Sequence, residues 1–257
     1  MPSVLVTGIS RLGGIAAAVV RALAREGWMV AGTGYRPYDA TEPWGPEPET
    51  PDKLLAEGVL AAWSEDDLGD ADAPARVFAA AEQVVGPLTA LVIVHTESRV
   101  GGVLDTTTAA FDRHMAVNAR ATMLLCAEFA RRFRGEHGSG RIVAFTSGAL
   151  HGEVAYGASK AAIERLVIAA AAELGPQGIT VNALNPGATD TGWMSTQLYE
   201  RIRETTPLGR VGRAEDAAEL VAFLCSPAGG WITGQILISD GGGSIAPALR
   251  RAREPFH

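Results

Sequence analysis

The stretch SVLVTGISRLGGIA, residues 3–16, predicts how the chain begins to fold. Its first five residues form a short apolar, β-branched run that ends at Gly8, and an alanine-rich helical pattern follows at about 14–26. Residues 29–34 form a second strand pattern, so the opening is a strand–helix–strand unit with parallel strands. Small loop residues would let a diphosphate reach the backbone at the helix N-terminus. Glycine loops also make ordinary tight turns, but this position favours phosphate binding.

The rest of the chain continues this alternation. Strand patterns lie at residues 59–63, 90–95, 141–146, 179–183 and 235–239, and helical patterns at 73–85, 107–133, 156–174 and 214–224. With no break in composition, residues 1–257 are predicted to be a single α/β domain, doubly wound around a mostly parallel seven-stranded sheet. Ligands of such sheets bind beyond the carboxyl ends of the strands. The residues that follow strand ends are Gly8, His95, Ser147, Pro186 and Gly187.

Residues 36–58 interrupt the pattern with five prolines. Because proline removes a backbone donor, this segment is predicted to be neither a regular helix nor a central strand. It is expected to be an ordered excursion at the surface. Two roles remain open for it: a cover for the adenosine end of a ligand, or an oligomer contact.

Composition excludes several classes of function. A net charge of −7, with no basic stripe, argues against a nucleic-acid binder. The N-terminus has no signal-peptide pattern, and no apolar run is long enough to span a membrane, so the protein is expected in the cytoplasm. Cys126 and Cys225 lie in apolar helical patterns that suit buried, reduced thiols, and no metal-ligand spacing is visible.

Tyr156 and Lys160 carry the first sign of chemistry. Four residues apart on a helix, they share one face, so the ammonium can lower the proton affinity of the phenol. Such a phenol is an acid suited to a carbonyl substrate. The spacing is common in helices, however, and other motifs must support this interpretation.

Those motifs are present in order, and with them the chain resembles the short-chain dehydrogenase/reductase family over essentially its whole length. The pieces that carry the resemblance are Thr7-Gly8, Asn118, Ser147, Tyr156, Lys160, Asn185-Pro186-Gly187 with Thr191, Ile232-Thr233-Gly234-Gln235, and Asp240-Gly241-Gly242. The resemblance implies a Rossmann fold and an oxidoreductase that moves a hydride between a nicotinamide cofactor and a carbonyl or secondary alcohol. It also implies a homotetramer or homodimer built on the helices that contain Asn118 and Tyr156.

The resemblance assigns roles to single residues. Tyr156 would exchange a proton with the substrate oxygen, Lys160 would lower its pKa and bind the nicotinamide ribose, Ser147 would hold the substrate oxygen, and Asn118 would anchor a water. Taken alone, Ser147 would be a capping or turn serine and Asn118 a helix-bending residue. The implied cofactor-binding residues are Gly8, Ser10, Arg11, Gly14, Ile15, Arg36, Asp67, Leu68, His95, Tyr156, Lys160, Pro186, Gly187, Thr189 and Thr191.

Three departures from the family pattern matter. The glycine loop is two residues longer than the family's, with Ala16 in place of a glycine, which resembles the enoyl-acyl-carrier-protein reductase branch. That branch, however, spaces its tyrosine and lysine more widely than Tyr156 and Lys160, which favours a ketoreductase centre here. The family's N-N-A-G is replaced by Ile93-Val94-His95-Thr96, where we interpret His95 as a local hydrogen-bonding substitute and not as a catalyst. The loop at 148–155, with His151 and Glu153, is several residues shorter, which leaves the substrate class open.

The cofactor is predicted to be NADP(H) in preference to NAD(H). An NAD enzyme needs an acid near the end of the second strand, and here none occurs before Asp39. Arg36 and Arg11 are instead predicted to meet a 2′-phosphate.

Residues 188–212 are expected to form the substrate lid. Trp193, Met194, Leu198, Tyr199 and Leu208 would line an apolar pocket, or would equally pack a helix pair or a subunit interface. The sequence therefore predicts an NADP-dependent reductase of a small carbonyl compound, including one of 3-oxoacyl type. The alternatives are a non-redox relative with lyase or dehalogenase chemistry and a nucleotide-sensing binding protein; Lys160 argues against the first and the complete Asn118, Ser147, Tyr156 and Lys160 set against the second.

Overall fold

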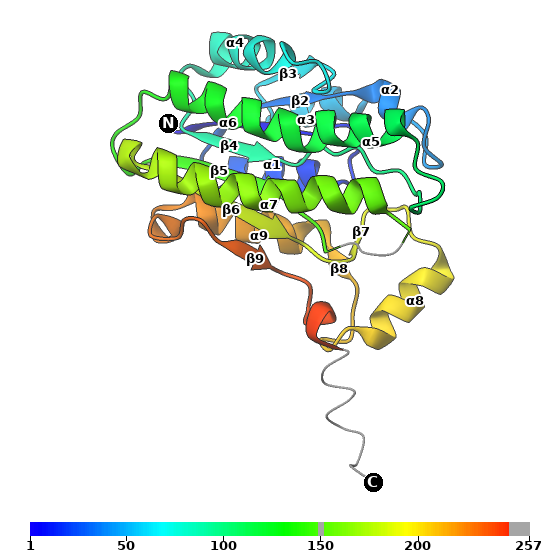
Figure 1. Cartoon of the computed structure of the whole chain (residues 1–257). Helices are drawn as coiled ribbons and strands as arrows, with labels where there is room; N and C mark the ends of the chain where they lie inside the picture. The colour runs from blue at the N-terminus through cyan, green and yellow to red at the C-terminus, as the bar shows by residue number, and fades with distance from the viewer. Residues whose placement is uncertain (149–151, 247–257) are drawn as a thin grey trace.

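The structure, a computed structural model, describes residues 1–148 and 152–246. Its centre is a parallel seven-stranded sheet in the order β3-β2-β1-β4-β5-β6-β9 (Figure 1). The strands are β1 Ser3–Thr7, β2 Met29–Gly34, β3 Ala62–Glu65, β4 Ala90–Ile93, β5 Gly140–Phe145, β6 Ile179–Asn185 and β9 Ile236–Ile238. The predicted doubly wound architecture is confirmed.

Helices cover both faces of the sheet. Ile15–Arg25 (α1) and Ala214–Cys225 (α9) pack on one face, and Ala73–Val85 (α4), Ala121–Arg132 (α6) and Val154–Leu174 (α7) on the other. Each face buries its own apolar cluster, which is why the central strands are apolar on both sides. Cys126 and Cys225 are buried free thiols within these clusters, as predicted.

The segment 36–58 corrects one prediction, because it contains two short helices, α2 Arg36–Asp39 and α3 Thr50–Ala56. Pro37 and Pro51 stand in the first turn of these helices, where the missing N–H has no partner to lose. The third strand also begins later than predicted. Residues 59 and 60 donate their N–H groups to the Leu54 carbonyl and so close α3, the Ala61 N–H is the first to bond to β2, and β3 begins at Ala62.

The predicted long helix at 107–133 changes its winding partway. It consists of α5 Thr108–His114, a π-helical segment η1 Met115–Arg120, and α6. Wider π turns occur often at functional sites, and this one contains Asn118.

The predicted lid contains a two-residue strand pair, β7 Thr189–Asp190 with β8 Gly212–Arg213, and helix α8 Thr196–Thr205. In Figure 1, α8 projects from the body of the molecule, and none of its residues is buried. Among the described helices, none combines the length and apolarity needed to cross a membrane.

Candidate active site

Tyr156 lies in the first turn of α7, close to the carboxyl ends of β4 and β5. Burial raises the pKa of its phenol, while hydrogen bonds with the Ser147 and Thr96 hydroxyls lower it and the nearby Glu153 raises it. Ser147 follows β5 and Thr96 follows β4, so the strand-end rule brings both hydroxyls to this phenol. Thr96 was not predicted as a site residue.

Lys160 lies one helical turn after Tyr156 and is 2% exposed. Its Nζ is 5.6 Å from the centre of the Tyr156 ring and donates a hydrogen bond to the Phe145 carbonyl at 3.0 Å. Burial lowers the pKa of the ammonium to about 7. The groups that lower the pKa of Tyr156 here are thus the two hydroxyls, and the predicted influence of Lys160 on the phenol remains a prediction.

Asn118 is 1% exposed, and its side chain joins three elements. Its Nδ2 donates to the Glu97 carbonyl and to Ser159 Oγ on α7, both at 2.8 Å. Its Oδ1 accepts the Glu97 N–H at 2.7 Å and lies 3.3 Å from Thr96 Oγ1. In this structure Asn118 therefore fixes the loop after β4 against the helix of Tyr156.

His95 is held through both ring nitrogens. Nε2 lies 2.9 Å from the Val117 carbonyl, an acceptor, so it must carry the proton, and Nδ1 then accepts from Thr7 Oγ1 at 2.8 Å. Burial, with a smaller contribution from Lys160, lowers the pKa of the imidazole to about 4. A neutral ring with both nitrogens occupied supports the interpretation of His95 as a hydrogen-bonding substitute.

A cleft opens between the glycine loop and the ends of β2 and β4. The predicted cofactor residues Gly8, Ser10, Arg11, Gly14, Ile15, Asp67, Leu68, His95 and Thr191 are among those that line it. Gly8 has φ +82°, and a Cβ there would lie 2.7 Å from the His95 nitrogen, so only glycine fits. Gly14, the N-cap of α1, makes no side-chain cap, which leaves N–H groups of the first turn available to an anion. The cleft therefore fits a dinucleotide.

The structure separates the two predicted arginines. Arg11 lines the cleft, lies 5.0 Å from the centre of the Trp44 ring, and donates to the Thr191 carbonyl at 2.8 Å. Arg36 is not among the lining residues; it is paired with Glu65 and stacked on Trp63 at 4.9 Å. The carboxylate and the indole face next to Arg36 hold it away from the position predicted for it.

Around Pro186 the predicted residues have structural contacts. A Cβ on Gly187 would lie 2.3 Å from Asp240 Cβ, so the glycine at 187 is what allows these two motifs to lie side by side. Thr189 is buried in β7 and donates to the Pro186 carbonyl at 3.3 Å. Neither Pro186, Gly187 nor Thr189 lines the cleft described above. In the short loop before Tyr156, Gly152 accepts the Gly101 N–H at 2.8 Å, and His151 lies outside the described residues.

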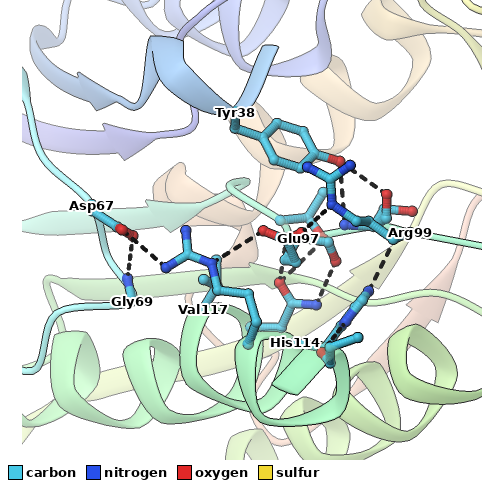
Figure 2. A network of polar contacts seen from close by, with 12 residues as sticks. Tyr38, Asp67, Gly69, Glu97, Arg99, His114 and Val117 are labelled. Atoms are coloured by element: carbon cyan, nitrogen blue, oxygen red, sulfur yellow. Dashed lines mark hydrogen bonds and ion pairs between the residues drawn. The ribbon is translucent and has the colours of Figure 1, made fainter. Parts of the chain in front are cut away.

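Sequence reasoning missed a charged network at the cleft, shown in Figure 2. Glu97 is 4% exposed and accepts from Arg99 Nε at 3.0 Å and Arg113 Nε at 3.3 Å. Arg113 Nη1 also donates to Asp67 at 2.9 Å, and the Gly69 N–H donates to the same carboxylate at 2.8 Å. Glu97 stands just beyond β4, so the strand-end rule was the one signal for it in the sequence.

Comparison with known proteins agrees with this geometry. A family model described as enoyl-(acyl carrier protein) reductase matches residues 8–244. The chain is 38% identical over 243 residues to the uncharacterized oxidoreductase YjdA of Bacillus subtilis, covering 93% of this chain and 95% of the relative. It superposes on a short-chain dehydrogenase from Burkholderia cenocepacia, crystallised in complex with NADP, with a TM-score of 0.81 and 32% identity, covering 95% of this chain and 98% of the other.

The chain belongs to the short-chain dehydrogenase/reductase family. As a member it is an oxidoreductase, and its seven-stranded sheet is the sheet of that family. A further relative is the versicolorin reductase of Emericella nidulans, 32% identical over 261 residues, which cover 93% of this chain and 94% of the relative. Thr96, which is hydrogen-bonded to Tyr156, lines the cleft and so connects it to this phenol.

Proposed function

We propose that this short-chain dehydrogenase/reductase is a cytoplasmic ketoreductase that reduces a carbonyl group with NADPH and oxidises the matching secondary alcohol in reverse. One observation carries the proposal: the Tyr156 phenol is hydrogen-bonded to the Ser147 and Thr96 hydroxyls, and Thr96 lines a cleft that fits a dinucleotide. NADPH, when bound, supplies the hydride.

The residues around Tyr156 would carry out the proton transfer. Burial raises the pKa of the phenol, so Tyr156 holds a proton that it can donate to the substrate oxygen as negative charge develops there. Ser147 donates a hydrogen bond to that oxygen and orients it toward the phenol. Lys160, whose Nζ lies 5.6 Å from the centre of the Tyr156 ring, would bind a ribose hydroxyl and, when charged, favour the phenolate in the oxidation direction.

Preference for NADPH rests on Arg11. Its guanidinium lines the cleft, where Glu47 lies 3.8 Å from its Nε, and a 2′-phosphate would be a second anionic partner for it. The NADP complex of the Burkholderia relative supports the same choice.

The substrate is proposed to be a medium-sized apolar ketone, including one of 3-oxoacyl type. In the lid, Trp193 and Leu208 expose 47% and 74% of their surface, which leaves apolar area for a substrate or a neighbouring subunit to cover. The proposed assembly is a homodimer or homotetramer, which the exposed Phe111, Met123 and Ile168 on α5, α6 and α7 support.

The test is NADPH and NADH consumption against a panel of ketones by wild type and Tyr156→Phe. Loss of the general acid should lower kcat by about 10²–10⁴-fold, while NADPH affinity stays near wild type. Undiminished turnover by the variant would remove Tyr156 as the acid. A wild type that binds NADPH but reduces none of the ketones would favour the nucleotide-sensing alternative, and equal or better use of NADH would overturn the cofactor assignment.

A further inference from the structure

A strap, defined here as residues 36–49, crosses the nucleotide end of the cleft and is fastened at both ends. At one end the Glu47 carboxylate accepts the Leu12 N–H of the glycine loop at 2.8 Å, and the Trp44 ring lies against Arg11. At the other end the Tyr38 hydroxyl donates to the Ser98 carbonyl at 3.0 Å and accepts the Ser98 N–H at 3.3 Å. Tyr38, Asp39 and Trp44 line the cleft, so the strap forms one of its walls.

Arg99 adds an ion pair to the contact between the strap and the loop 96–99. Its Nη1 lies 3.0 Å from Glu42 Oε1, and its Nη2 donates to Thr41 Oγ1 at 2.7 Å, both on the strap. Its Nε is used by Glu97, and its plane lies 5.5 Å from the centre of the Tyr38 ring. A planar guanidinium with several donors suits this threefold contact, which a lysine could not make.

Glu97 connects this fastening to the proton-transfer residues. In Figure 2 it lies between Asp67 on one side and Arg99 and Tyr38 on the other. Its backbone N–H and C=O are both bound by Asn118, whose Oδ1 also lies 3.3 Å from Oγ1 of Thr96, the neighbour of Tyr156. A buried carboxylate is stable only when it is paired, so Glu97 with its two arginines forms one well-defined arrangement of the loop 96–99.

We propose that Glu97 is a positioning residue that fixes the loop 96–99 as a joint between the strap and Tyr156. Through Arg99 it holds the strap across the nucleotide, and through the Asn118-bound backbone it sets the Thr96 hydroxyl against the phenol. The second half rests on the proposed function, because it requires Tyr156 to be the proton donor. The first half requires only that the cleft bind the nucleotide.

Three variants separate the two halves. In Glu97→Gln the amide can accept from one arginine but turns an N–H toward the other, so the joint is lost without loss of volume. Arg99→Gln releases the strap and leaves Glu97 paired with Arg113. Thr96→Val removes only the hydroxyl beside Tyr156. The matched control is Glu82→Gln, which breaks an ion pair with Arg132 at 2.8 Å between α4 and α6, outside the cleft.

Two readouts report on the two halves: the dissociation constant of NADPH, from its fluorescence, and the pH profile of kcat/KM for NADP⁺ with the alcohol of the best ketone in the panel. Glu97→Gln should weaken NADPH binding about fivefold, the size of one lost hydrogen bond, and move the limb governed by Tyr156 to higher pH by about half a unit. Arg99→Gln should change only the NADPH affinity, and Thr96→Val should shift only the Tyr156 limb of the pH profile. In the double variant Glu97→Gln/Thr96→Val, that limb should shift no further than in Thr96→Val alone.

Thermal unfolding of every variant is measured alongside. If Glu97 were merely structural, Glu97→Gln would lower the melting temperature, as we expect of Glu82→Gln, and would leave both readouts at wild type, which would overturn the proposal. A change of Glu97→Gln in only one of the two readouts would overturn it too. Undiminished turnover in Tyr156→Phe would instead count against the proposed function, and the NADPH affinity of Glu97→Gln would still decide the part of the proposal that concerns the strap.

Discussion

At the proton end of the cleft, Tyr156 and Lys160 share one face of a single helix, whereas at the nucleotide end Arg11, Trp44 and Arg99 come from three separate loops. The first arrangement follows from helix geometry and short hydrogen bonds to strand ends. The second depends on ion pairs and ring contacts across 33 residues or more of sequence, as between Arg11 and Trp44. Charged contacts that are partly exposed are screened by salt, so the nucleotide end should be the more salt-sensitive of the two.

The largest expected effect comes from Gly8, where the two ends meet. Gly8→Ala places a methyl group within 2.8 Å of two His95 backbone atoms at φ +82°. We expect a loss of about 3–5 kcal/mol of stability, from left-handed strain plus the overlap, and loss of NADPH binding. Chemical denaturation and nucleotide fluorescence measure the two effects.

Gly27→Ala is the control, since Gly27 has φ +83° with nothing within 4 Å. It should lose only about 1 kcal/mol, from strain alone, and bind NADPH normally. Equal losses in the two variants would show that close approach of Gly8 to His95 contributes nothing.

A smaller effect is expected from His95 on acid stability. Its pKa is near 4 in the folded protein and 6.5 in the unfolded chain, so between these values the unfolded chain binds more protons and stability falls as the pH falls. We expect His95 to account for a loss of about 2 kcal/mol in the free energy of unfolding. This is less than the full pKa difference would give, because the ring borders the open cleft and is partly screened by solvent. Urea unfolding of wild type and His95→Asn at pH 7, 5.5 and 4.5 measures the difference in slope. Parallel slopes would contradict the burial of a neutral ring.

The smallest effect distinguishes the two arginines. Arg11→Gln should raise the KM for NADPH about tenfold, as expected for a lost charge-assisted hydrogen bond, and leave the KM for NADH unchanged. Arg36→Gln, which breaks a pair with Glu65 outside the cleft, should change neither by more than about twofold. A larger effect on the KM for NADPH at Arg36 than at Arg11 would restore the sequence-based prediction that Arg36 contacts the 2′-phosphate.

Elements with strong periodicity were predicted well, and irregular ones were not. The runs that became β1, β4 and β6 are apolar enough to identify without tertiary contacts. The start of β3 was predicted three residues early, because only the turn closed by Leu54 shows that residues 59 and 60 belong to the end of α3. The short helices α2 and α3 were missed because a proline in a first helical turn looks the same in sequence as one that breaks a helix.

The sequence by itself determined the alternation of strands and helices, the glycine loop at the first strand end, and the pairing of Tyr156 with Lys160, because all three depend on short spacings and on one rule about parallel sheets. The tertiary structure alone decided that Arg36 turns to Glu65, that Arg11 stays at the cleft, and that Glu97 joins the strap to Asn118. Side chains far apart in sequence find their partners only after the backbone has brought them together, and Arg99 and Arg113 each contact two carboxylates here.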